Sequence, residues 1–425
     1  MVSKLAYVFL VSVLFLQCSK KSSIADPADN EYQGPYGTLA FYINRSNVPD
    51  GVAGITITFT RALFAPFSDS ARLDLILSTT LRFDSIATGA WQMKTVMRNN
   101  AGNIVSTDEK NFVVEEDTLT QLLGVTAGGE FIYIPLSDSI QTWIDNSSNP
   151  VLARSDSDLP VRWIYNPIVL SEDDTFYVWF TGIQVDSSAR TINFAQSMDG
   201  EQWILGSNQP ILKPGSPVDW DYNHIATGPI IKENGVYRLY YNSLSDFIPD
   251  WKVGLATSTD KIQWIKHGNP VLVPEGSEGR VNAVAVIKIG SSFYMYYNHL
   301  QGTGLAISTD GINWSKNVSS ILRTTYAWEG SQAIASCVFY ENGLYRMIYY
   351  NSEASKFGEA VSLEGIYWFK ISEDPFFTKD QTSNLWAIDQ IAYCSAISVN
   401  GRLRLFYSGY NGALADWRIG FADEQ

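Results

Sequence analysis

Cysteine and histidine are both scarce in this chain of 425 residues, which contains three of each. The histidines show no paired spacing, so the sequence indicates no transition-metal site and no cofactor. Acidic side chains leave a structural calcium ion as the one open alternative. Beyond Cys18 only Cys337 and Cys394 remain, too few for a disulfide framework. We expect these two to be small buried apolar residues, with one disulfide between them as the alternative.

Charged residues are also few, at 17% of the chain, and the acids outnumber the bases to give a formal net charge of −14. This excess argues against nucleic acid or an anionic membrane surface as the main partner. Aromatic residues make up 13% of the sequence, a content typical of proteins rich in half-buried strands. The composition therefore favours an all-β fold.

The start of the chain has the features of an export signal. Lys4 precedes an apolar segment at residues 5–16, which is too short for a membrane-spanning helix and ends at Gln17-Cys18. This arrangement over residues 1–18 resembles the lipobox of bacterial lipoproteins, including those of Bacteroidetes, although Gln17 stands where Gly, Ala or Ser is usual. The resemblance implies that Cys18 is acylated and anchors the protein to the outer membrane, on its periplasmic or its surface face. Plain secretion is the alternative, and the polar residues 19–35 would form a flexible tether.

Residues 36–150 are predicted to form an immunoglobulin-like antiparallel β-sandwich and a linker. Short alternating segments recur at residues 38–43, 54–60, 91–97 and 112–115. The second of them places Ile55, Ile57 and Phe59 on one face. No long segment has helical periodicity, and the ionisable residues are scattered, so this domain is expected to be a spacer or accessory module.

The second half of the chain repeats itself. A turn of the form Ser-x-Asp-Gly-x-x-Trp occurs, with small variations, at residues 197–203, 258–264, 308–314 and 362–368. A longer phrase with two strands, a turn and terminal aromatic residues occurs at 167–180, 229–241, 284–297, 337–350 and 395–407. The period of roughly 50–60 residues is typical of propeller blades, and each Trp is expected to pack between neighbouring blades. Residues 151–425 are therefore predicted to form a five-bladed β-propeller.

These phrases resemble the five-bladed glycosidase superfamily that includes glycoside hydrolase families 32, 43 and 130. The resemblance implies a carbohydrate ligand and catalytic carboxylates on the inner strands of the first three blades. This chain departs from that pattern, because Asn166-Pro167 stands at the first such position and Gly228-Pro229 at the second. Neither residue supplies a carboxylate.

Acidic residues do occur just before the predicted inner strands. Asp221, Glu278 and Glu329 each precede one blade, where their carboxylates could converge on one axis. We predict these three to be catalytic, with Glu278 or Glu329 as the proton donor and Asp221 as the base or its electrostatic partner. The alternative is that they cap turns or bind neighbouring blades by hydrogen bonds.

Other residues in the same segments are predicted to bind substrate. Asn166 and Arg280 could bind sugar hydroxyls or a uronate carboxylate, and His224 a hydroxyl. Trp220 and Trp328 could stack on a sugar ring, and Asp389 precedes the fifth blade. For each of these residues, a structural hydrogen bond or burial between blades is the alternative.

Three functions are compatible with these features. The leading hypothesis is a glycoside hydrolase acting on an oligosaccharide or polysaccharide at the cell envelope. The second is a non-catalytic glycan-binding lipoprotein on a degenerate glycosidase scaffold, which the residues Asn166 and Gly228 favour. The third is a propeller that binds a protein, since a fold alone does not define a function.

Overall fold

The chain folds into two units that are described separately, Met1–Ile140 and Gln141–Gln425. This computed structural model describes residues 36–44, 52–61, 67–72, 78–87, 89–114, 118–123, 132–137, 142–154, 161–245, 248–341, 344–362, 365–366, 368–372 and 374–425. The predicted signal peptide, Cys18 and the predicted tether lie outside these residues. Within them, no helix is long and apolar enough to cross a membrane.

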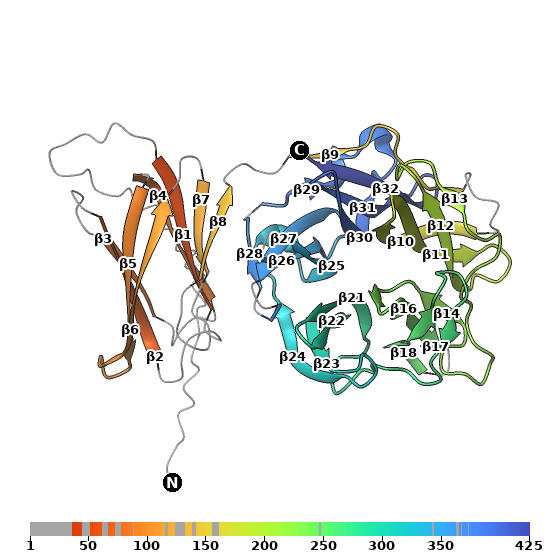
Figure 1. The fold of residues 1–425 in the computed structure, drawn as a ribbon, viewed down its shortest axis with the longest axis horizontal. Coiled ribbons are helices and arrows are strands. Elements are labelled where there is room, and N and C mark those ends of the chain that lie inside the picture. Colours follow the sequence, from red (N-terminus) through yellow and green to blue (C-terminus); the bar gives the residue numbers. More distant parts are fainter. Residues whose placement is uncertain are drawn as a thin grey trace, which may run out of the picture. The chain divides into compact units, whose positions relative to one another are not determined.

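The first unit contains two four-stranded sheets (Figure 1). One has the order β4 (Ser78–Ala87), β1 (Tyr36–Asn44), β7 (Thr118–Leu123), β8 (Ile132–Ser137). The other has the order β3 (Phe67–Arg72), β2 (Val52–Thr60), β5 (Gly89–Asn99), β6 (Ile104–Val114). Ile55, Ile57 and Phe59 are buried on one face of β2, as their alternation predicts. The pairing of β1 with β7 is parallel, so the predicted purely antiparallel arrangement is not what these strands form.

The second unit is built from five consecutive groups of antiparallel strands. Group 1 comprises β10 (Val161–Glu172), β11 (Thr175–Gln184), β12 (Arg190–Ser197) and β13 (Ile204–Leu205). Group 2 comprises β15 (Ile230–Glu233), β16 (Val236–Leu239), β19 (Ala256–Ser258) and β20 (Ile265–Lys266). Its chain also forms β14 (His224–Ala226), β17 (Asn242–Ser245) and β18 (Ile248–Val253), which extend the sheet of group 1 beyond β12. Group 3 comprises β21 (Asn282–Ile289), β22 (Ser292–His299), β23 (Gly302–Ser308) and β24 (Ser315–Leu322).

The last two groups have the same plan. Group 4 comprises β25 (Ala333–Glu341), β26 (Leu344–Asn351), β27 (Lys356–Ser362) and β28 (Phe369–Lys370), with β29 (Phe377–Thr378) also paired to β27. Group 5 comprises β30 (Gln390–Val399), β31 (Arg402–Asn411) and β32 (Asp416–Glu424), and β9 (Trp143–Asp145) is its outermost strand. Three short 3-10 helices precede the last two groups, at Ala327–Glu329, Lys379–Gln381 and Ser383–Leu385.

The first strands of all five groups surround one central channel (Figure 1). Residues of β10, β14, β21, β25 and β30 line a cavity in it, and later residues of the same strands, with β15 following β14, line a second cavity. The second unit is therefore propeller-like, with the first strand of every group innermost.

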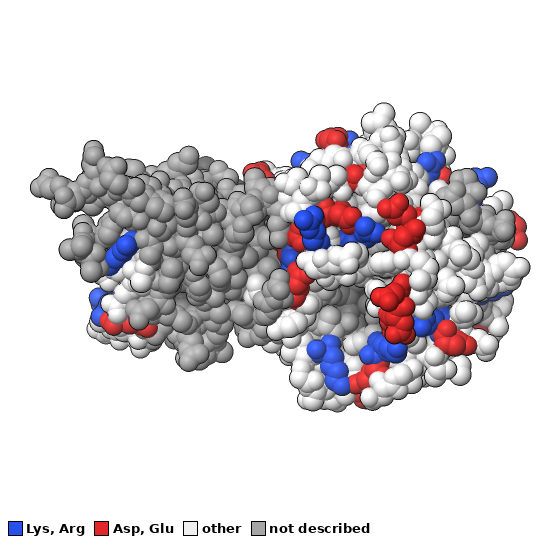
Figure 2. Space-filling model, turned by 45° about the horizontal axis from the view of Figure 1, so that its top comes forward, with Lys and Arg blue, Asp and Glu red and all other residues white. Residues whose placement is uncertain are grey.

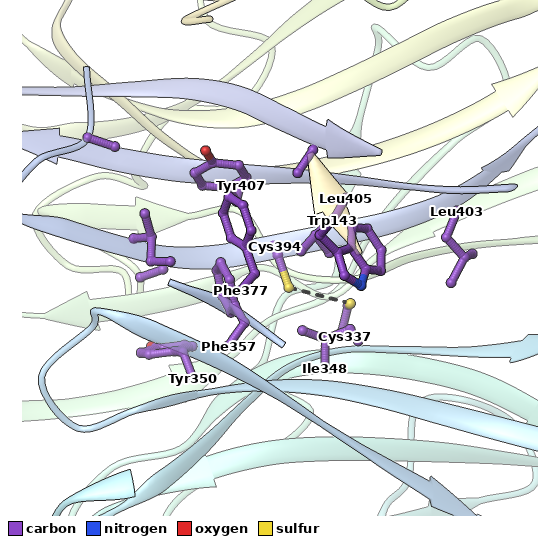
Figure 3. Close-up of a cluster of buried hydrophobic side chains, with 14 of the residues drawn as sticks. Trp143, Cys337, Ile348, Tyr350, Phe357, Phe377, Cys394, Leu403, Leu405 and Tyr407 are labelled. Atoms are coloured by element: carbon purple, nitrogen blue, oxygen red, sulfur yellow. Dashed lines mark hydrogen bonds between the residues drawn. The ribbon is translucent and has the colours of Figure 1, made fainter. Parts of the chain in front are cut away.

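Group 5 is completed by residues from the start of the unit. Ala422 of β32 pairs with Asp145 and Glu424 with Trp143, and the N–H of Leu152 donates to the carbonyl of Ile419 over 3.1 Å. Trp143 enters the core between groups 4 and 5, beside Ile348 (Figure 3). This pairing joins the beginning of the unit to its end.

The two remaining cysteines lie in the same core. Cys337 of β25 and Cys394 of β30 are buried free thiols whose Sγ atoms are 3.6 Å apart (Figure 3). Burial raises the pKa of the Cys394 thiol well above its ordinary value. Both cysteines are thus small buried residues without a disulfide, as predicted.

The repeated turn is stabilised by its own side chains. In the first copy the Asp199 carboxylate accepts from the N–H groups of Glu201 and Gln202, both over 2.8 Å. The Ser197 hydroxyl accepts from Gly200, whose φ of 78° favours glycine. Backbone donors of this kind hold the pKa of Asp199, and of Asp310 in a later copy, below the usual range.

The tryptophan of each turn packs against the preceding group. Trp264 of group 2 meets Trp179 of group 1 edge to face at a ring-centroid distance of 6.4 Å. The same contact is made by Trp314 with Tyr240, Trp368 with Tyr296 and, across the closure, Trp203 with Phe406. The prediction that these rings pack between neighbouring units of the repeat is confirmed.

Candidate functional site

The cavity at one end of the central channel has a volume of about 460 Å³. All five strand groups contribute to its walls. Its polar side chains are amides, imidazoles, guanidinium groups and one hydroxyl: Asn166, Arg190, His224, Asn242, Arg280, Asn282, Asn298, His299, Gln332 and Ser336. Its aromatic side chains are Tyr165, Trp251, Tyr350 and Tyr393. No aspartate or glutamate is among the described residues that line it.

The first strands bulge where they reach this cavity. The register of β10 against β11 shifts between Tyr165 and Ile168, and β21, β25 and β30 shift at corresponding places. At the bulge Asn166 has a φ of 56°, its N–H donates to the Ser408 hydroxyl over 2.8 Å, and its Nδ2 donates to the Thr227 carbonyl over 2.6 Å. Asn166 therefore joins group 1 to groups 5 and 2, and its amide also faces the cavity.

The backbone explains why no acid stands at residue 228. A Cβ atom on Gly228 would lie 1.9 Å from the carbonyl oxygen of Tyr240, closer than any side chain tolerates. The adjacent Thr227 hydroxyl is bound by that of Thr181 over 2.9 Å. Position 228 therefore accepts glycine only, and no carboxylate can stand there.

The three acids predicted as catalytic do not line the cavity. Each is buried and accepts a hydrogen bond from a tyrosine in or just after the second strand of its own group. Tyr241 donates to Asp221 over 2.9 Å, Tyr297 to Glu278 over 2.9 Å, and Tyr349 to Glu329 over 2.8 Å. We define these three acid–tyrosine pairs, with the lysines described next, as the acid–tyrosine–lysine ties.

The lysine of each tie comes from the fourth strand, two residues after the turn tryptophan. Lys266 pairs with Asp221 at 2.6 Å, Lys370 pairs with Glu329 at 2.5 Å, and Lys316 pairs with Glu278. Each ammonium group also donates to a carbonyl of the segment before the group, at Lys213, Val273 or Arg323. Each tie thus binds the entry segment, second strand and fourth strand together, which is the structural alternative considered above.

Groups 1 and 5 show what happens when a member of the tie changes. In group 5, Ala387 follows Trp386 where an acid follows Trp220 and Trp328. Tyr407 instead donates over 2.5 Å to Asp145, which stands where the other groups have lysine. In group 1 the position of the tyrosine is Phe180, which needs no acceptor. In each of groups 2 to 5, the tyrosine hydroxyl therefore has a carboxylate acceptor.

Electrostatics agree with a structural role for the ties. Burial alone would raise the pKa of Glu278, but the Lys316 ammonium, the Glu275 N–H and the Tyr297 hydroxyl hold that pKa below its usual range. Burial and the adjacent carboxylates raise the pKa values of Tyr241, Tyr297 and Tyr349 well above the ordinary value. Glu278 is thus kept ionised, whereas a general acid needs a raised pKa.

Three of the residues predicted to bind substrate line the cavity, and three do not. Asn166, His224 and Arg280 line it. Trp220 stacks on Tyr241 at 5.9 Å and Trp328 on Tyr349 at 5.8 Å, so both rings pack against the ties. Asp389 accepts from the N–H of Gly412 over 2.6 Å.

The structure adds residues that the sequence did not single out. Arg190 begins β12 and Trp251 lies in β18, and the Arg190 guanidinium lies 5.4 Å from the centroid of the indole ring. Asn282 of β21 lines the cavity without a side-chain hydrogen bond to any described residue. No motif marks these residues, because each occurs in only one group.

Metal ligands are not gathered in the parts of the chain that the structure describes: no three His, Cys, Asp or Glu side chains there could hold an ion together. On the face of the second unit seen in Figure 2, basic and acidic side chains are interspersed and form no continuous basic surface.

Comparisons of the sequence with known proteins find relatives of low identity. No family model matches the chain. An uncharacterised protein of Mycobacterium tuberculosis (strain CDC 1551 / Oshkosh) is 26% identical over 279 residues, 60% of this chain and 89% of that protein. A probable arabinan endo-1,5-alpha-L-arabinosidase A of Aspergillus fumigatus is 23% identical over 44% of this chain and 58% of its own length. A 1,2-beta-oligomannan phosphorylase of Thermoanaerobacter sp. is 20% identical over 44% of this chain and 63% of its own length.

Solved structures give the same result. A glycosyl hydrolase from Bacteroides ovatus superposes with a TM-score of 0.52 at 15% identity, covering 67% of this chain and 93% of that one. A thermostable family-43 glycoside hydrolase superposes with a TM-score of 0.51 at 18% identity, covering 65% and 92%. The protein is thus an all-β protein with a glycoside hydrolase-like propeller fold.

The ties predict a loss of stability when one member is removed. In Lys370→Met the fully buried Glu329 loses its oppositely charged partner, and we expect the free energy of unfolding to fall by about 3–5 kcal/mol. Glu329→Gln should also destabilise, since it leaves Lys370 unpaired. Urea denaturation measures both, with Lys356→Met of the same group as the unaffected control. Wild-type stability in Glu329→Gln, together with loss of an activity on glycans, would instead make Glu329 catalytic.

Glu278 predicts a dependence of stability on pH. Because its pKa is lowered in the folded state, its ionised form stabilises the fold above the ordinary glutamate range, and this contribution is lost as the pH falls through the folded pKa. The difference in free energy of unfolding between wild type and Glu278→Gln should be largest near neutral pH and shrink below about pH 4. Urea denaturation across this range measures it, with the exposed Glu353→Gln as control. A difference that is constant with pH would contradict this assignment.

Proposed function

We propose that the protein recognises a carbohydrate in the central cavity of a five-bladed, glycosidase-like β-propeller. The observation that carries the proposal is the lining of the cavity, where amide, imidazole and guanidinium groups of groups 1 to 4 lie among aromatic rings of groups 1, 2, 4 and 5. Each strand group would be one blade, with β9 completing the fifth. The first unit would be a β-sandwich that serves as an accessory module.

The chemistry of the lining suits sugar hydroxyls. Asn282 and His224 offer both donors and acceptors, as each hydroxyl group requires. The faces of Trp251 and the cavity tyrosines suit the C–H faces of a sugar ring. A volume of about 460 Å³ lies in the range of pockets that hold small ligands. These features support an oligosaccharide end or a short segment of a polysaccharide as ligand.

Binding is favoured over hydrolysis by the same lining. Glycosidases of the usual kind need two carboxyl groups on either side of the scissile bond. The described lining has none, and Asp221, Glu278 and Glu329 are engaged in the ties. A glycoside hydrolase remains the second candidate, because the solved structures that resemble this fold include glycoside hydrolases.

The test is a glycan screen of the protein trimmed after Cys18, with calorimetry for binding and reducing-sugar release for hydrolysis. We expect binding of at least one glycan without product, and about fivefold weaker binding in Asn282→Ala, which removes one uncompensated hydrogen bond. The exposed Asn208→Ala is the matched control. Release of sugar would establish the hydrolase instead. If no glycan is bound and none is hydrolysed, a carbohydrate ligand is refuted and a protein partner is favoured.

We further propose that the protein is a lipoprotein of the cell envelope, anchored through Cys18. The support is the apolar segment at residues 5–16 followed by that cysteine. Expressed as the full chain in a bacterium, wild type should enter the detergent phase on Triton X-114 partition, while Cys18→Ala should stay in the aqueous phase. Equal partition of the two would exclude the anchor. Protease treatment of intact cells then reports which face of the membrane carries it.

A further inference from the structure

Two arginines, Arg190 and Arg280, line the cavity and are both connected to the strand of Trp251. Arg190 covers one face of the Trp251 indole with its guanidinium group. The carbonyl of Trp251 accepts the N–H of Val281 over 3.0 Å, which holds the segment of Arg280 beside the same strand. The N–H of Arg280 itself donates to the Glu278 carbonyl over 2.7 Å. The tie of Glu278 therefore also positions Arg280 at the cavity.

Neither guanidinium group has an acidic partner in the described part of the chain. The ion pairs of the second unit include Lys266, Lys316 and Lys370, but not Arg190 or Arg280. Arg190 is half-buried and Arg280 is exposed, and the described lining of the cavity contains no carboxylate. The cavity thus carries two fixed positive charges in a chain whose formal net charge is −14.

The positive charges act inside the cavity. Burial raises the pKa of Tyr165, and the charge of Arg190 opposes that rise; Arg280 acts in the same sense on Tyr350. A cleft with charges of one sign attracts ligands of the other sign. Uncharged sugars need hydrogen-bond partners for their hydroxyl groups, and the amides of the cavity already supply these. Two guanidinium groups without an acidic partner therefore call for an anion.

We infer that the cavity selects an acidic saccharide, whose anionic group is bound by Arg190 and Arg280. The inference rests on the proposed carbohydrate-binding function and names its substrate class. The planar guanidinium fork matches a carboxylate in two parallel hydrogen bonds, as a uronic acid would offer, and it also binds a sulfate ester. Asn282 and His224 would then bind the neighbouring hydroxyls, and Trp251 would keep the Arg190 fork in place.

The experiment compares acidic saccharides with matched neutral ones on the protein trimmed after Cys18. The probes are trimers of galacturonic and mannuronic acid, their carboxyl-reduced neutral counterparts, and chondroitin disaccharides with and without sulfate. We expect the acidic probes that bind to do so at least tenfold more tightly than their neutral counterparts, by calorimetry. This binding should weaken as NaCl is raised from about 50 mM to about 500 mM, since salt screens the charges.

Variants locate the effect. Arg190→Gln and Arg280→Gln should each weaken binding of the acidic probe about tenfold or more, a larger loss than for its neutral counterpart. Arg190→Lys keeps the charge without the fork and should fall between wild type and Arg190→Gln. Arg402→Gln, at an exposed arginine outside the cavity, is the matched control. Thermal melting checks that each variant is folded, and the salt dependence of wild type tests the inference without any variant.

The outcomes separate this inference from the function on which it rests. Preference for the uronates or for the sulfated disaccharide supports it and identifies the anion. Binding of neutral sugars that equals binding of acidic ones overturns the inference and leaves the carbohydrate-binding function standing. Binding of no saccharide, acidic or neutral, overturns both.

Discussion

The contact on which the second unit depends is the edge-to-face packing of one aromatic ring between neighbouring strand groups. The turn tryptophans of groups 1 to 4 each meet a ring of the preceding group, and Trp203 against Phe406 carries the contact across the closure. Group 5 lacks the turn, and between groups 4 and 5 Trp143 of β9 joins Ile348 in the buried core. Because these contacts fix each group against the next, the first strands are held around a common channel, and residues far apart in sequence become neighbours in one cavity.

Repetition distinguishes structure from function in this chain. The acid, the tyrosine and the lysine of the ties recur in groups 2, 3 and 4, and in group 5 Asp145 replaces the missing acid as the acceptor of the tyrosine. A residue that every group needs serves the group itself. Arg190, Trp251, His224 and Asn282 are each confined to one group, yet all four meet at the cavity. The repeated acids at the group entries therefore say more about how a group holds together than about the chemistry at the centre.

The sequence predicted the repeated local features of the structure. It missed the contacts between residues that lie far apart in the chain. Strand groups, hairpin turns and the packing of Trp264, Trp314 and Trp368 follow from local patterns, because turn chemistry and alternation act within a few residues. The spacing Trp-x-Lys was visible three times, but only the fold shows that Lys266, Lys316 and Lys370 reach the entry acids. The three-residue strand β9 could not be assigned to group 5, since its partner β32 lies some 270 residues away and its own pattern is too short. For the same reason, nothing in the sequence indicated that Arg190 lies beside Trp251.

The net charge of the chain is negative and the charge of its cavity lining is positive. This difference follows from where the acidic residues are placed. In the ties each carboxylate is paired with an ammonium group a hydrogen bond away, so the two charges largely cancel beyond that distance. Screening limits the reach of the remaining surface acids to about 8 Å at physiological ionic strength. The potential inside the cavity is therefore set by the groups that line it, of which the charged ones are Arg190 and Arg280. An acidic protein can in this way present a cationic site, and its net charge does not restrict the sign of its ligand.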